Sequence, residues 1–581
     1  MEQFSTGKKR PIFDRYFAYL ERRKPSDRLF LYITLFVLAG SIAFTFLFVS
    51  DGHKITIATD GGTLVEGVIG TPRFANPILA ITRADQDIVA LLYSGLMRLS
   101  AEGLHEPDLA ESVTVSVDGL VYNVVLKNNI QFHDGVPLKA DDVAYTIGLI
   151  QDPALKSPLQ GNWNDVVIEV ISETELNFVL SEPYTPFIEN LTVGILPKHV
   201  WSELSTEQLP FSQHNTEPIG SGPYLLKDVA HNKSGLIDSY ILSAFPAEES
   251  PAKISNVILN FYPNEETLIT AFDEGEISNS AAFSYETLNH IDTSKYTIIE
   301  HPLPRVFSVF LNQNKSAALR DESVRQALSV AIDRDALIET ALYGHGVPTH
   351  TPIPPGFLEV ESVDASSTPR SATTSADITY AQSLLTDGNW EQQDDGSWMK
   401  DIDDVPTKLS ITITTVNTDV FIKTAEHIQS AWEALGVDVS VAIFEQSDLV
   451  QVIIRPRDYQ ALLFGTETGR GLDLYPFWHS SQKDDPGLNV ALYTNISADK
   501  LLETIRTTRD EAEKISALRT FEDEIISETP AIFLYSPTFT YVTSNKVNAP
   551  QMKRIVRPSE RFREIRIWHM NESSVWPFFA N

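Results

Sequence analysis

The sequence predicts an α/β protein with more than one lobe, preceded by one transmembrane helix. Three observations support this prediction. A strand–helix–strand pattern runs from 409 to 444, alternating apolar residues around Asp118 and Gly119 indicate a β-hairpin, and residues 29–49 form an apolar run without a charge. The length of 581 residues exceeds that of an ordinary single domain and suggests about two to four of them.

Composition and charge narrow the class of protein. Hydrophobic residues make up 43% of the chain, as in globular proteins, which excludes wholesale disorder and a polytopic membrane protein. The net charge of −33 argues against nucleic-acid binding, because phosphate neutralisation requires basic surface. Without cysteine, the chain cannot form disulfides, a thiolate nucleophile, a Cys-ligated zinc site or a lipidated anchor.

The N-terminal segment predicts the membrane topology. Residues 29–49 are uncharged, and 21 residues of helix span about 30 Å, the thickness of a bilayer core. Residues 1–50 carry a net charge of +4 on the N-terminal side of this run, so residues 1–28 should stay in the cytoplasm and the acidic remainder should be exported. Residues 46–54 contain no Ala-x-Ala cleavage pattern, which favours a single-pass anchor in the cell membrane. A cleaved signal peptide and a buried soluble helix remain the alternatives.

Strands and turns come first in the exported part. Residues 113–126 alternate in polarity on both sides of Asp118-Gly119, which is typical of a hairpin. Asp134-Gly135 marks a second turn. We expect Asp141 to cap a helix that runs from about Val143 to Ile150.

Two helices are expected in the middle of the chain. Asp321 or Ser323 should start the first, and Asp333 should start the second. Gly344 is placed to end the second helix, because glycine adopts the left-handed conformation that often closes a helix.

The strand–helix–strand pattern follows. Leu409, Ile411 and Ile413 alternate with polar residues as in a strand, and a helix is expected from about 422 to 435. Gly436 should end this helix, and residues 437–444 read as the next strand. Two strands joined by a helix pair in parallel, which predicts an α/β domain.

Two proline-containing or polar stretches suggest crossings between lobes. They are residues 301–305 and 545–550, and both lie between apolar runs. Chain that crosses between two lobes more than once is the anatomy of a hinged binding protein. Residues 364–376 are rich in Ser and Thr and are expected to form an exposed loop.

A search for catalytic and metal motifs finds little. Zinc-protease, Walker A, nucleophile-elbow and dinucleotide-binding patterns are absent, so no enzyme and no cofactor are expected. Gly220 to Gly222 reads as a tight turn rather than a phosphate loop, and His345 and His350 as surface histidines rather than metal ligands. Three acidic pairs read as solvated loops rather than calcium ligands: Asp394-Asp395, Asp403-Asp404 and Asp484-Asp485.

Several motifs together resemble one family. Residues 107–146, PDLAESVTVSVDGLVYNVVLKNNIQFHDGVPLKADDVAYT, resemble the signature region of the family 5 extracellular solute-binding proteins, the peptide- and nickel-binding components of ABC importers. Further motifs follow in the order of that family and extend the resemblance over about 54–570. They are ILPKHVW (195–201), PIGSGPYLL (218–226), LRDESVRQALSVAIDRDALIE (319–339), YAQSLLTDGNW (380–390), FWHSSQ (477–482) and ERFREIRIW (560–568).

The resemblance implies a two-lobed periplasmic-binding-protein-like fold with an extra inserted subdomain. Ligand would lie in the cleft between the two lobes, which close around it by hinge motion. The implied parts are a first lobe made of about 54–84, 218–300 and 546–581, an inserted subdomain at about 85–217, and a second lobe at about 301–545.

The resemblance also implies ligand contacts. In peptide-binding members an aspartate of the last lobe holds the α-amino group of the ligand, and Asp473 in GLDLYPFWHSS is the best match. A helix cap or a loop position is the alternative for this residue. Arg305 and Arg470 are candidates for the ligand carboxylate.

Other contacts are expected from the first lobe and from aromatic walls. The first-lobe contacts of the family fall near residues 67–77, where Thr71 could meet a peptide backbone. The aromatic residues Phe74, Tyr93, Tyr475 and Trp478 lie near Gly or Pro and are candidates for the walls of a cleft, although most aromatic side chains pack in cores.

The expected function is therefore capture of oligopeptides or similar small solutes outside the membrane and delivery to an ABC permease, by a monomer held at the membrane by its N-terminal helix. A membrane-anchored surface receptor of the same fold, used for signalling or adhesion, is the alternative. An exported hydrolase is a third possibility, since paired carboxylates of a glycosidase meet only in space.

Overall fold

The computed structural model describes residues 24–44, 55–248, 250–358, 376–508, 510–550 and 555–575. The predicted exposed loop at 364–376, apart from its last residue, lies outside the described residues, as do residues 1–23 of the predicted cytoplasmic segment and 45–49 of the predicted membrane span. The chain divides into two compact units, Met1–Thr59 with Asn571–Asn581 and Asp60–Met570.

The first unit contains a helix and a pair of strands. Helix α2 (Pro25–Phe44) begins with a proline, whose fixed φ suits the first helical turn. Its window Pro25–Ile42 is long and apolar enough to cross a membrane, judged by length and composition, and a membrane anchor and a signal sequence share these properties. Strand β1 (Ile55–Thr59) pairs antiparallel with β23 (Asn571–Val575).

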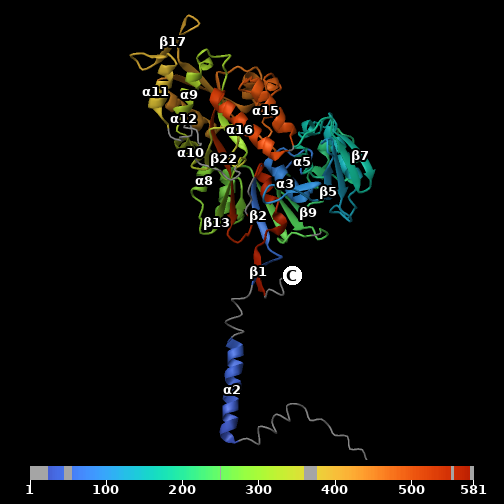
Figure 1. Cartoon of the computed structure of the whole chain (residues 1–581). Helices are drawn as coiled ribbons and strands as arrows, with labels where there is room; N and C mark the ends of the chain where they lie inside the picture. The colour runs from blue at the N-terminus through green and yellow to red at the C-terminus, as the bar shows by residue number, and fades with distance from the viewer. Residues whose placement is uncertain are drawn as a thin grey trace, which may run out of the picture. The chain divides into compact units, whose positions relative to one another are not determined.

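A mixed twelve-stranded sheet organises the second unit (Figure 1). Parallel and antiparallel neighbours both occur in it, so the predicted α/β class is confirmed. In spatial order its strands are β20 (Asp438–Phe444), β19 (Ser410–Val416), β21 (Ala461–Glu467), β14 (Arg305–Leu311), β22 (Ala531–Ser544), β12 (Asn279–Ser280), β2 (Thr63–Ile69), β11 (Asn256–Tyr262), β10 (Ile237–Ala244) and β9 (Tyr224–His231), and β13 (Tyr296–Pro302) and β15 (Gly346–Pro348) also pair with β22.

Strand β22 joins the two halves of this sheet. Its first residues pair with β14, and its residues 538–544 pair with β13. The chain therefore passes between the halves within β22 and at the 303–304 link between β13 and β14. The sequence expectation of a crossing at 301–305 falls on that link, whereas the expected crossing at 545–550 lies just beyond the end of β22.

Helices cover both faces of the β14–β20 half of the sheet. One core contains buried residues of α9, α10, α11 and α12, and another contains residues of α14, α15 and α16 (Figure 1). The helices in this half of the sheet are α9 (Glu322–Val330), α10 (Arg334–Leu342), α11 (Ile378–Asp387), α12 (Asp419–Leu435), α13 (Gln446–Asp448), α14 (Tyr475–Trp478), α15 (Ile496–Thr507) and α16 (Glu511–Glu528). A three-stranded sheet stands beside them, made of β16 (Glu391–Gln392), β17 (Trp398–Ile402) and β18 (Val405–Lys408).

The predicted starts of two helices in this half are confirmed. Asp321 caps α9 by accepting a hydrogen bond from Ser323 N, and Asp333 caps α10 by accepting from Ala336 N. The predicted end at Gly344 is not confirmed, because α10 ends at Leu342 and Tyr343 already adopts the left-handed conformation with a φ of 53°.

Helix α12 begins at Asp419, before the expected start near 422. Strands β19 and β20 pair in parallel on either side of α12, as the sequence pattern predicts. Gly436 ends α12 with a φ of 100°, and a Cβ there would lie 2.3 Å from Gly396 O, so both conformation and space require glycine.

A separate four-stranded antiparallel sheet follows the order β5 (Ala110–Val115), β6 (Val121–Leu126), β8 (Glu175–Val179), β7 (Val167–Ser172). The predicted hairpin at 113–126 is confirmed by β5 and β6, and the predicted turn at Asp134-Gly135 is confirmed by a φ of 85° at Gly135. The predicted cap is wrong: helix α4 (Ala140–Gln151) begins after Lys139, whose N–H donates to Asp142 at 2.8 Å, so Asp142 and not Asp141 closes this end.

The remaining elements complete the half of the second unit around β2. They are α3 (Arg83–Leu92), β3 (Met97–Leu99), β4 (His105–Pro107), α5 (Phe187–Asn190), α6 (Lys198–Trp201), α7 (Glu265–Asp273) and α8 (Tyr285–Leu288). One continuous core contains residues of β2, α3, β6, α4, β8, β10 and β11. The four-stranded sheet therefore shares its core with the β2 side of the large sheet.

The predicted tight turn at Gly220 to Gly222 is not found; residues 218–221 have no regular structure and a bend follows at 222–223. A Cβ on Gly220 would lie 1.9 Å from Leu92 O, so only glycine lets this segment approach the end of α3. His133 holds the segment, because its Nδ1 accepts from Gly220 N at 3.2 Å while its Nε2 lies 3.1 Å from Gly222 O. Burial lowers the pKa of His133 to about 4, which keeps the ring neutral in this role.

Candidate functional site

A cavity of about 850 Å³ lies in the second unit, between stretches that are far apart in sequence. Its walls come from residues 77–99, 159–194, 467–477 and 557–566. Cavities that bind small molecules measure about 300–1,000 Å³ and combine apolar surface with a few polar groups. This cavity meets both conditions, since apolar side chains such as Met97 and Leu99 lie beside several arginines and carboxylates.

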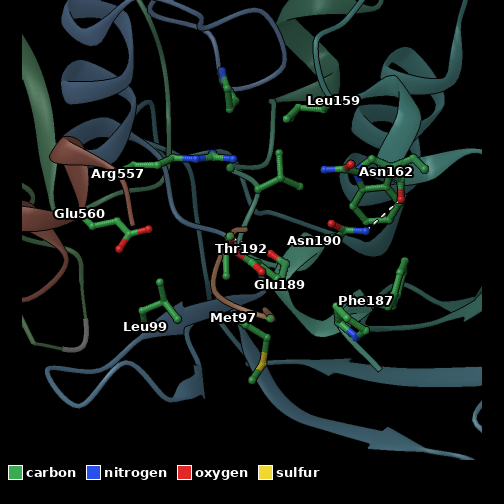
Figure 2. Close-up of a pocket in the computed structure, with 18 of the residues that line it drawn as sticks. Met97, Leu99, Leu159, Asn162, Phe187, Glu189, Asn190, Thr192, Arg557 and Glu560 are labelled. Atoms are coloured by element: carbon green, nitrogen blue, oxygen red, sulfur yellow. Dashed lines mark hydrogen bonds between the residues drawn. The ribbon is translucent and has the colours of Figure 1, made fainter. Parts of the chain in front are cut away.

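One wall is formed by residues 159–194 (Figure 2). Asn190 Nδ2 donates to Asn162 O at 2.9 Å and holds two parts of this wall together. Glu189 belongs to the same wall and interacts electrostatically with Arg470. Burial raises the pKa of Glu189, and the nearby Arg470 opposes that shift.

The opposite wall carries Asp473, whose carboxylate forms an ion pair with Arg506. Arg506 Nη2 lies 3.2 Å from Asp473 Oδ2. The guanidinium also lies over two aromatic rings, 4.6 Å from the ring centroid of Tyr475 and 5.3 Å from that of Tyr184. Burial raises the pKa of Asp473, whose side chain is 17% exposed, and Arg506 lowers it.

These two walls touch each other beside the cavity. Thr185 Oγ1 donates to Thr508 O at 3.3 Å, and a Cβ on Gly471 would lie 3.1 Å from Cβ of Pro186. The backbone at Gly471 therefore fits closely against the neighbouring wall, and the cavity is bounded on this side by direct contact.

The C-terminal segment supplies a third wall. The 3-10 helix η9 (Pro558–Phe562) places Glu560 beside the cavity, with Arg557 before it and Arg563 after it. Arg470 Nη2 pairs with Glu560, which also accepts from Val556 N at 3.0 Å. In Figure 2 the side chain of Arg557 extends from the C-terminal segment towards the wall that carries Asn162.

Arg561 of the same helix faces away from the cavity and into the core. Its guanidinium donates to Glu66 at 2.8 Å and to both oxygens of Asp87 at 2.7 Å. Tyr541 OH donates to the remaining Glu66 oxygen at 2.9 Å. All three charged side chains are at most 1% exposed, so this ion-pair cluster ties η9 to β2 and α3.

The predicted site residues separate into two groups. Asp473 and Tyr93 line the cavity, and Tyr93 has a buried hydroxyl without a hydrogen-bond partner in the described part of the chain. Tyr475 lies against Arg506 behind the wall. Phe74 is half-buried beside Arg73, and Thr71 is exposed.

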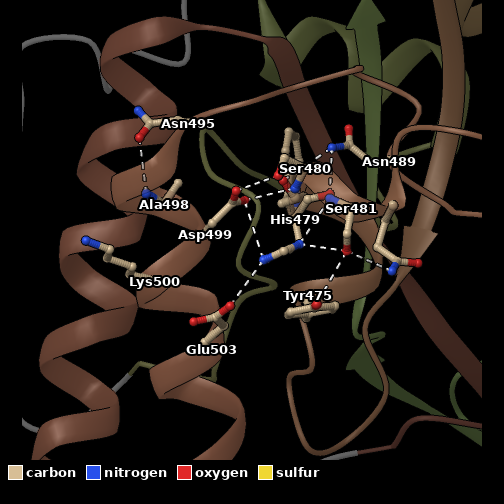
Figure 3. A network of polar contacts seen from close by, with 12 residues as sticks. Tyr475, His479, Ser480, Ser481, Asn489, Asn495, Ala498, Asp499, Lys500 and Glu503 are labelled. Atoms are coloured by element: carbon tan, nitrogen blue, oxygen red, sulfur yellow. Dashed lines mark hydrogen bonds and ion pairs between the residues drawn. The ribbon is translucent and has the colours of Figure 1, made fainter.

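Trp478 lies in the core, 1% exposed, where it packs against Phe310 and Phe533. A polar network next to it holds the loop that carries Asp473 (Figure 3). Tyr475 stacks on His479 with ring centroids 4.1 Å apart, and Asn489 Nδ2 donates to the His479 carbonyl at 3.1 Å. The FWHSSQ motif therefore supports the Asp473 wall from behind.

The two carboxylate-binding candidates from the sequence already have partners. Arg305 Nε lies 2.8 Å from Glu467, and Arg470 pairs with Glu560. Of the predicted surface histidines, His345 pairs with Glu300 at 3.0 Å, while burial lowers the pKa of His350 to about 4. Within the described ranges no group of three or more His, Cys, Asp or Glu side chains could hold a metal ion.

A cavity of ligand size between separate walls, in a mixed α/β fold, defines a binding protein for a small solute. Residues 105–487, more than half of the chain, match the family model described as bacterial extracellular solute-binding proteins, family 5 Middle. The chain therefore belongs to the family 5 bacterial extracellular solute-binding proteins, and the predicted resemblance is confirmed.

Named relatives agree with this assignment. The chain is 28% identical to the oligopeptide-binding protein AppA of Bacillus subtilis over 82% of this chain and 86% of that protein. It is 26% identical to the nickel-binding periplasmic protein of Escherichia coli over 80% and 86%, respectively.

Solved structures share the fold. The AppA structure from B. subtilis, in complex with a nonapeptide, superimposes with a TM-score of 0.66 at 25% identity, over 89% of this chain and all of that one. The ABC transporter substrate-binding protein CtaP of Listeria monocytogenes gives a TM-score of 0.72 at 24% identity, over 88% and 99%. The predicted periplasmic-binding-protein-like fold is thereby confirmed.

The sequence analysis missed most residues of the cavity, among them Tyr184, Arg506, Arg557 and Arg563. The motif ERFREIRIW contains Arg563, but its charges give no sign of which arginine faces the core and which faces the cavity. Tyr184 and Arg506 meet Asp473 only through the tertiary fold.

Proposed function

We propose that this protein captures oligopeptides or similar small solutes outside the membrane and delivers them to an ABC permease, without making or breaking a bond. The observation that supports this function is the cavity of about 850 Å³, whose walls carry both positive and negative side chains. A peptide has one charged group at each end and a polar backbone between them, which suits such a lining. The similarity to a protein solved with a nonapeptide points the same way.

In this function Asp473 contacts the ammonium group of the ligand. A buried ammonium requires an opposite charge that also accepts its hydrogen bonds. Arg506 already pairs with Asp473, so the ligand amine either shares the carboxylate with Arg506 or displaces it. Tyr93 contributes an aromatic wall with an unpaired hydroxyl that a peptide group can satisfy. Thr71, Phe74, Tyr475 and Trp478 would act behind this surface or at its edge.

The lobes are proposed to close around the ligand by hinge motion. Residues 85–217 act as the inserted subdomain, and their four-stranded sheet belongs to it. The links within β22 and between β13 and β14 are the hinge. Contacts such as Thr185 to Thr508 would form on closure and break on opening.

Helix α2 is proposed to remain in place as a membrane anchor, with the N-terminus in the cytoplasm. Its apolar composition and the basic residues before it support this role. Tethering would keep the binding protein at a high effective concentration near its permease, where it acts as a monomer. We expect full-length protein to stay with membranes after a carbonate wash. Recovery of a soluble product that begins near residue 51 would contradict the anchor.

The alternative, a membrane-anchored surface receptor used for signalling or adhesion, gains no support from the described structure. The relatives named above bind oligopeptides or nickel.

Thermal unfolding of the detergent-solubilised full chain, with and without a pool of random pentapeptides, tests the proposed function. A ligand that binds only the folded state raises the melting temperature by mass action. A rise with the peptide pool, absent with an equal concentration of free amino acids, is expected. If neither the pentapeptide pool nor a pool of longer peptides shifts the transition, the protein does not bind peptides.

A further inference from the structure

The C-terminal wall of the cavity contains a buried arginine whose hydrogen-bonding groups are largely unused. The side chain of Arg563 is 6% exposed, and it lines the cavity. Its Nη2 donates to Ala101 O at 2.9 Å. Its Nε and Nη1 have no hydrogen-bond partner among the described residues, and its nearest carboxylate, Glu560, lies 3.9 Å from Nη1.

Such a group calls for an explanation, because a buried guanidinium that lacks partners is costly. Burial lowers the pKa of Arg563, which reflects the same missing compensation. Glu560 cannot supply it, since Arg470 and Val556 N already occupy that carboxylate. Arg470 has the same deficit, as its Nε and Nη1 are also buried without partners.

Arg557 adds an accessible positive charge to this wall. It lines the cavity, and its side chain is exposed. Arg470 and Arg563 share the carboxylate of Glu560, and Glu564 and Glu102 also act on Arg563 electrostatically. Glu189 is another carboxylate of the cavity lining, and burial raises its pKa.

The opposite wall has its charge balanced, because Arg506 pairs with Asp473. The idle donors on the C-terminal wall therefore belong to Arg563, and the same wall carries the exposed guanidinium of Arg557. Arginine presents a planar fork of N–H donors that matches the two oxygens of a carboxylate. A carboxylate at this position would use the idle Nε and Nη1 of Arg563.

We propose that Arg563 and Arg557 bind a carboxylate of the ligand, so that the protein selects peptides with a free acidic group. This inference rests on the proposed function and adds to it the chemical group that the cavity recognises. The carboxylate can belong to the C-terminus of a peptide or to an acidic side chain. Both sources offer the same planar pair of oxygens.

Competition between two peptide pools tests the proposal. The full-length protein in detergent is incubated with equal amounts of random pentapeptides as free acids and as C-terminal amides, and the bound peptides are identified by mass spectrometry. We expect the free acids to be enriched about ten- to hundredfold, as for a hydrogen bond to a charged group. In Arg563→Gln the enrichment should disappear, and in Arg557→Gln it should decrease.

A matched control is Arg320→Gln. Arg320 pairs with Asp403 on the exposed surface, and it does not line the cavity. Its removal should leave the enrichment unchanged. If Arg563→Gln does not fold, as judged by thermal unfolding, the wild type and Arg557→Gln still decide the outcome.

An amidated pool with glutamate at one position separates the two sources of the carboxylate. Binding of this pool at the level of free acids assigns the site to side-chain carboxylates, and weak binding assigns it to the C-terminus. Equal retention of acids and amides by the wild type, with peptides clearly bound, overturns the inference and leaves the proposed function intact. An enrichment that survives in Arg563→Gln and in Arg557→Gln also overturns it. Retention of no peptide at all contradicts the proposed function itself.

Discussion

Arg561 and Arg563 are two residues apart in the same segment, both are buried, and they have opposite surroundings. Arg561 makes a hydrogen bond with each of its five N–H groups, to Glu66, Asp87 and Pro558. Arg563 makes one, to Ala101. We therefore assign the saturated charge of Arg561 to the stability of the fold, and our proposal assigns the unsaturated charge of Arg563 to a ligand.

The largest expected loss of stability follows replacement of Arg561, whose N–H groups all have partners. Arg561→Met leaves Glu66 and Asp87 buried without compensation, and breaking such a cluster typically costs about 3–5 kcal/mol. The free energy of unfolding in urea should fall by about that amount. Arg320→Met, which removes an exposed ion pair, is the control and should change little. A similar stability for Arg561→Met and wild type would show that the cluster does not stabilise the fold.

Arg566 offers an intermediate case. Its side chain is 18% exposed and donates to Glu248 at 2.8 Å, to Ser94 at 3.1 Å and to Asp108 at 3.3 Å. Burial alone would lower its pKa, but Asp108 and Glu248 outweigh burial and raise it. We expect Arg566→Met to lower the free energy of unfolding by about 1–3 kcal/mol. If Arg566→Met loses as much stability as Arg561→Met, the number of hydrogen bonds that an arginine makes determines the loss, and its depth of burial does not.

Asp473 is a charged residue whose partner in the protein, Arg506, also lies in the binding site. Asp473→Asn keeps the shape and removes the charge that a ligand amine would need. Binding of free-amine peptides should weaken about ten- to hundredfold, which corresponds to the loss of a charged hydrogen bond. Calorimetry with N-acetylated peptides is the control, since they carry no amine charge and should be affected far less. If both kinds of peptide lose the same affinity, Asp473 holds Arg506 and its own loop in place and does not bind the ligand amine.

Stability should respond to Arg563 in the opposite way to Arg561. Replacing an unpaired buried charge with an apolar side chain removes a desolvation penalty, so Arg563→Met should leave the free energy of unfolding unchanged or raise it. Urea unfolding at neutral pH measures this. A loss as large as that of Arg561→Met would contradict the comparison, because it would make Arg563 a structural residue.

The smallest effect concerns His301, whose pKa is lowered by burial and further by Arg563. A lowered pKa favours the neutral ring in the folded state. The protein therefore loses stability as the pH falls below about 6.5 through the folded pKa of His301. Arg563→Gln should raise the pKa of His301, as followed by NMR titration of the ring protons. An unchanged pKa of His301 in this variant would mean that Arg563 does not act on His301 electrostatically.

Local features of the fold could be predicted from the sequence, because nearby residues determine them. Gly436 ends α12, Asp321 and Asp333 cap their helices, and Asp118-Gly119 forms its hairpin turn, since each depends on a few adjacent residues. The cap of α4 was misjudged because Asp141 and Asp142 are equivalent in sequence, and only the direction of their side chains separates them.

The cavity could be predicted only in part. Asp473 was found through the family resemblance and Tyr93 as an aromatic candidate for the wall of a cleft, and both line the cavity. Trp478 was expected at a wall and lies in the core, because an aromatic residue beside proline suits either place. Nothing local marks Arg506 as the partner of Asp473, or Arg563 as the unsaturated arginine of its segment, since partners from distant parts of the chain decide both.

Identification of the ligand that co-purifies with the protein tests the central claim most directly. The full-length chain would be purified in mild detergent and measured by native mass spectrometry, then denatured and the released molecules sequenced. The account predicts a complex heavier than the chain by the mass of short peptides, and release of peptides with free carboxylates. A preparation that carries no peptide and also gains none from added peptide pools would contradict it.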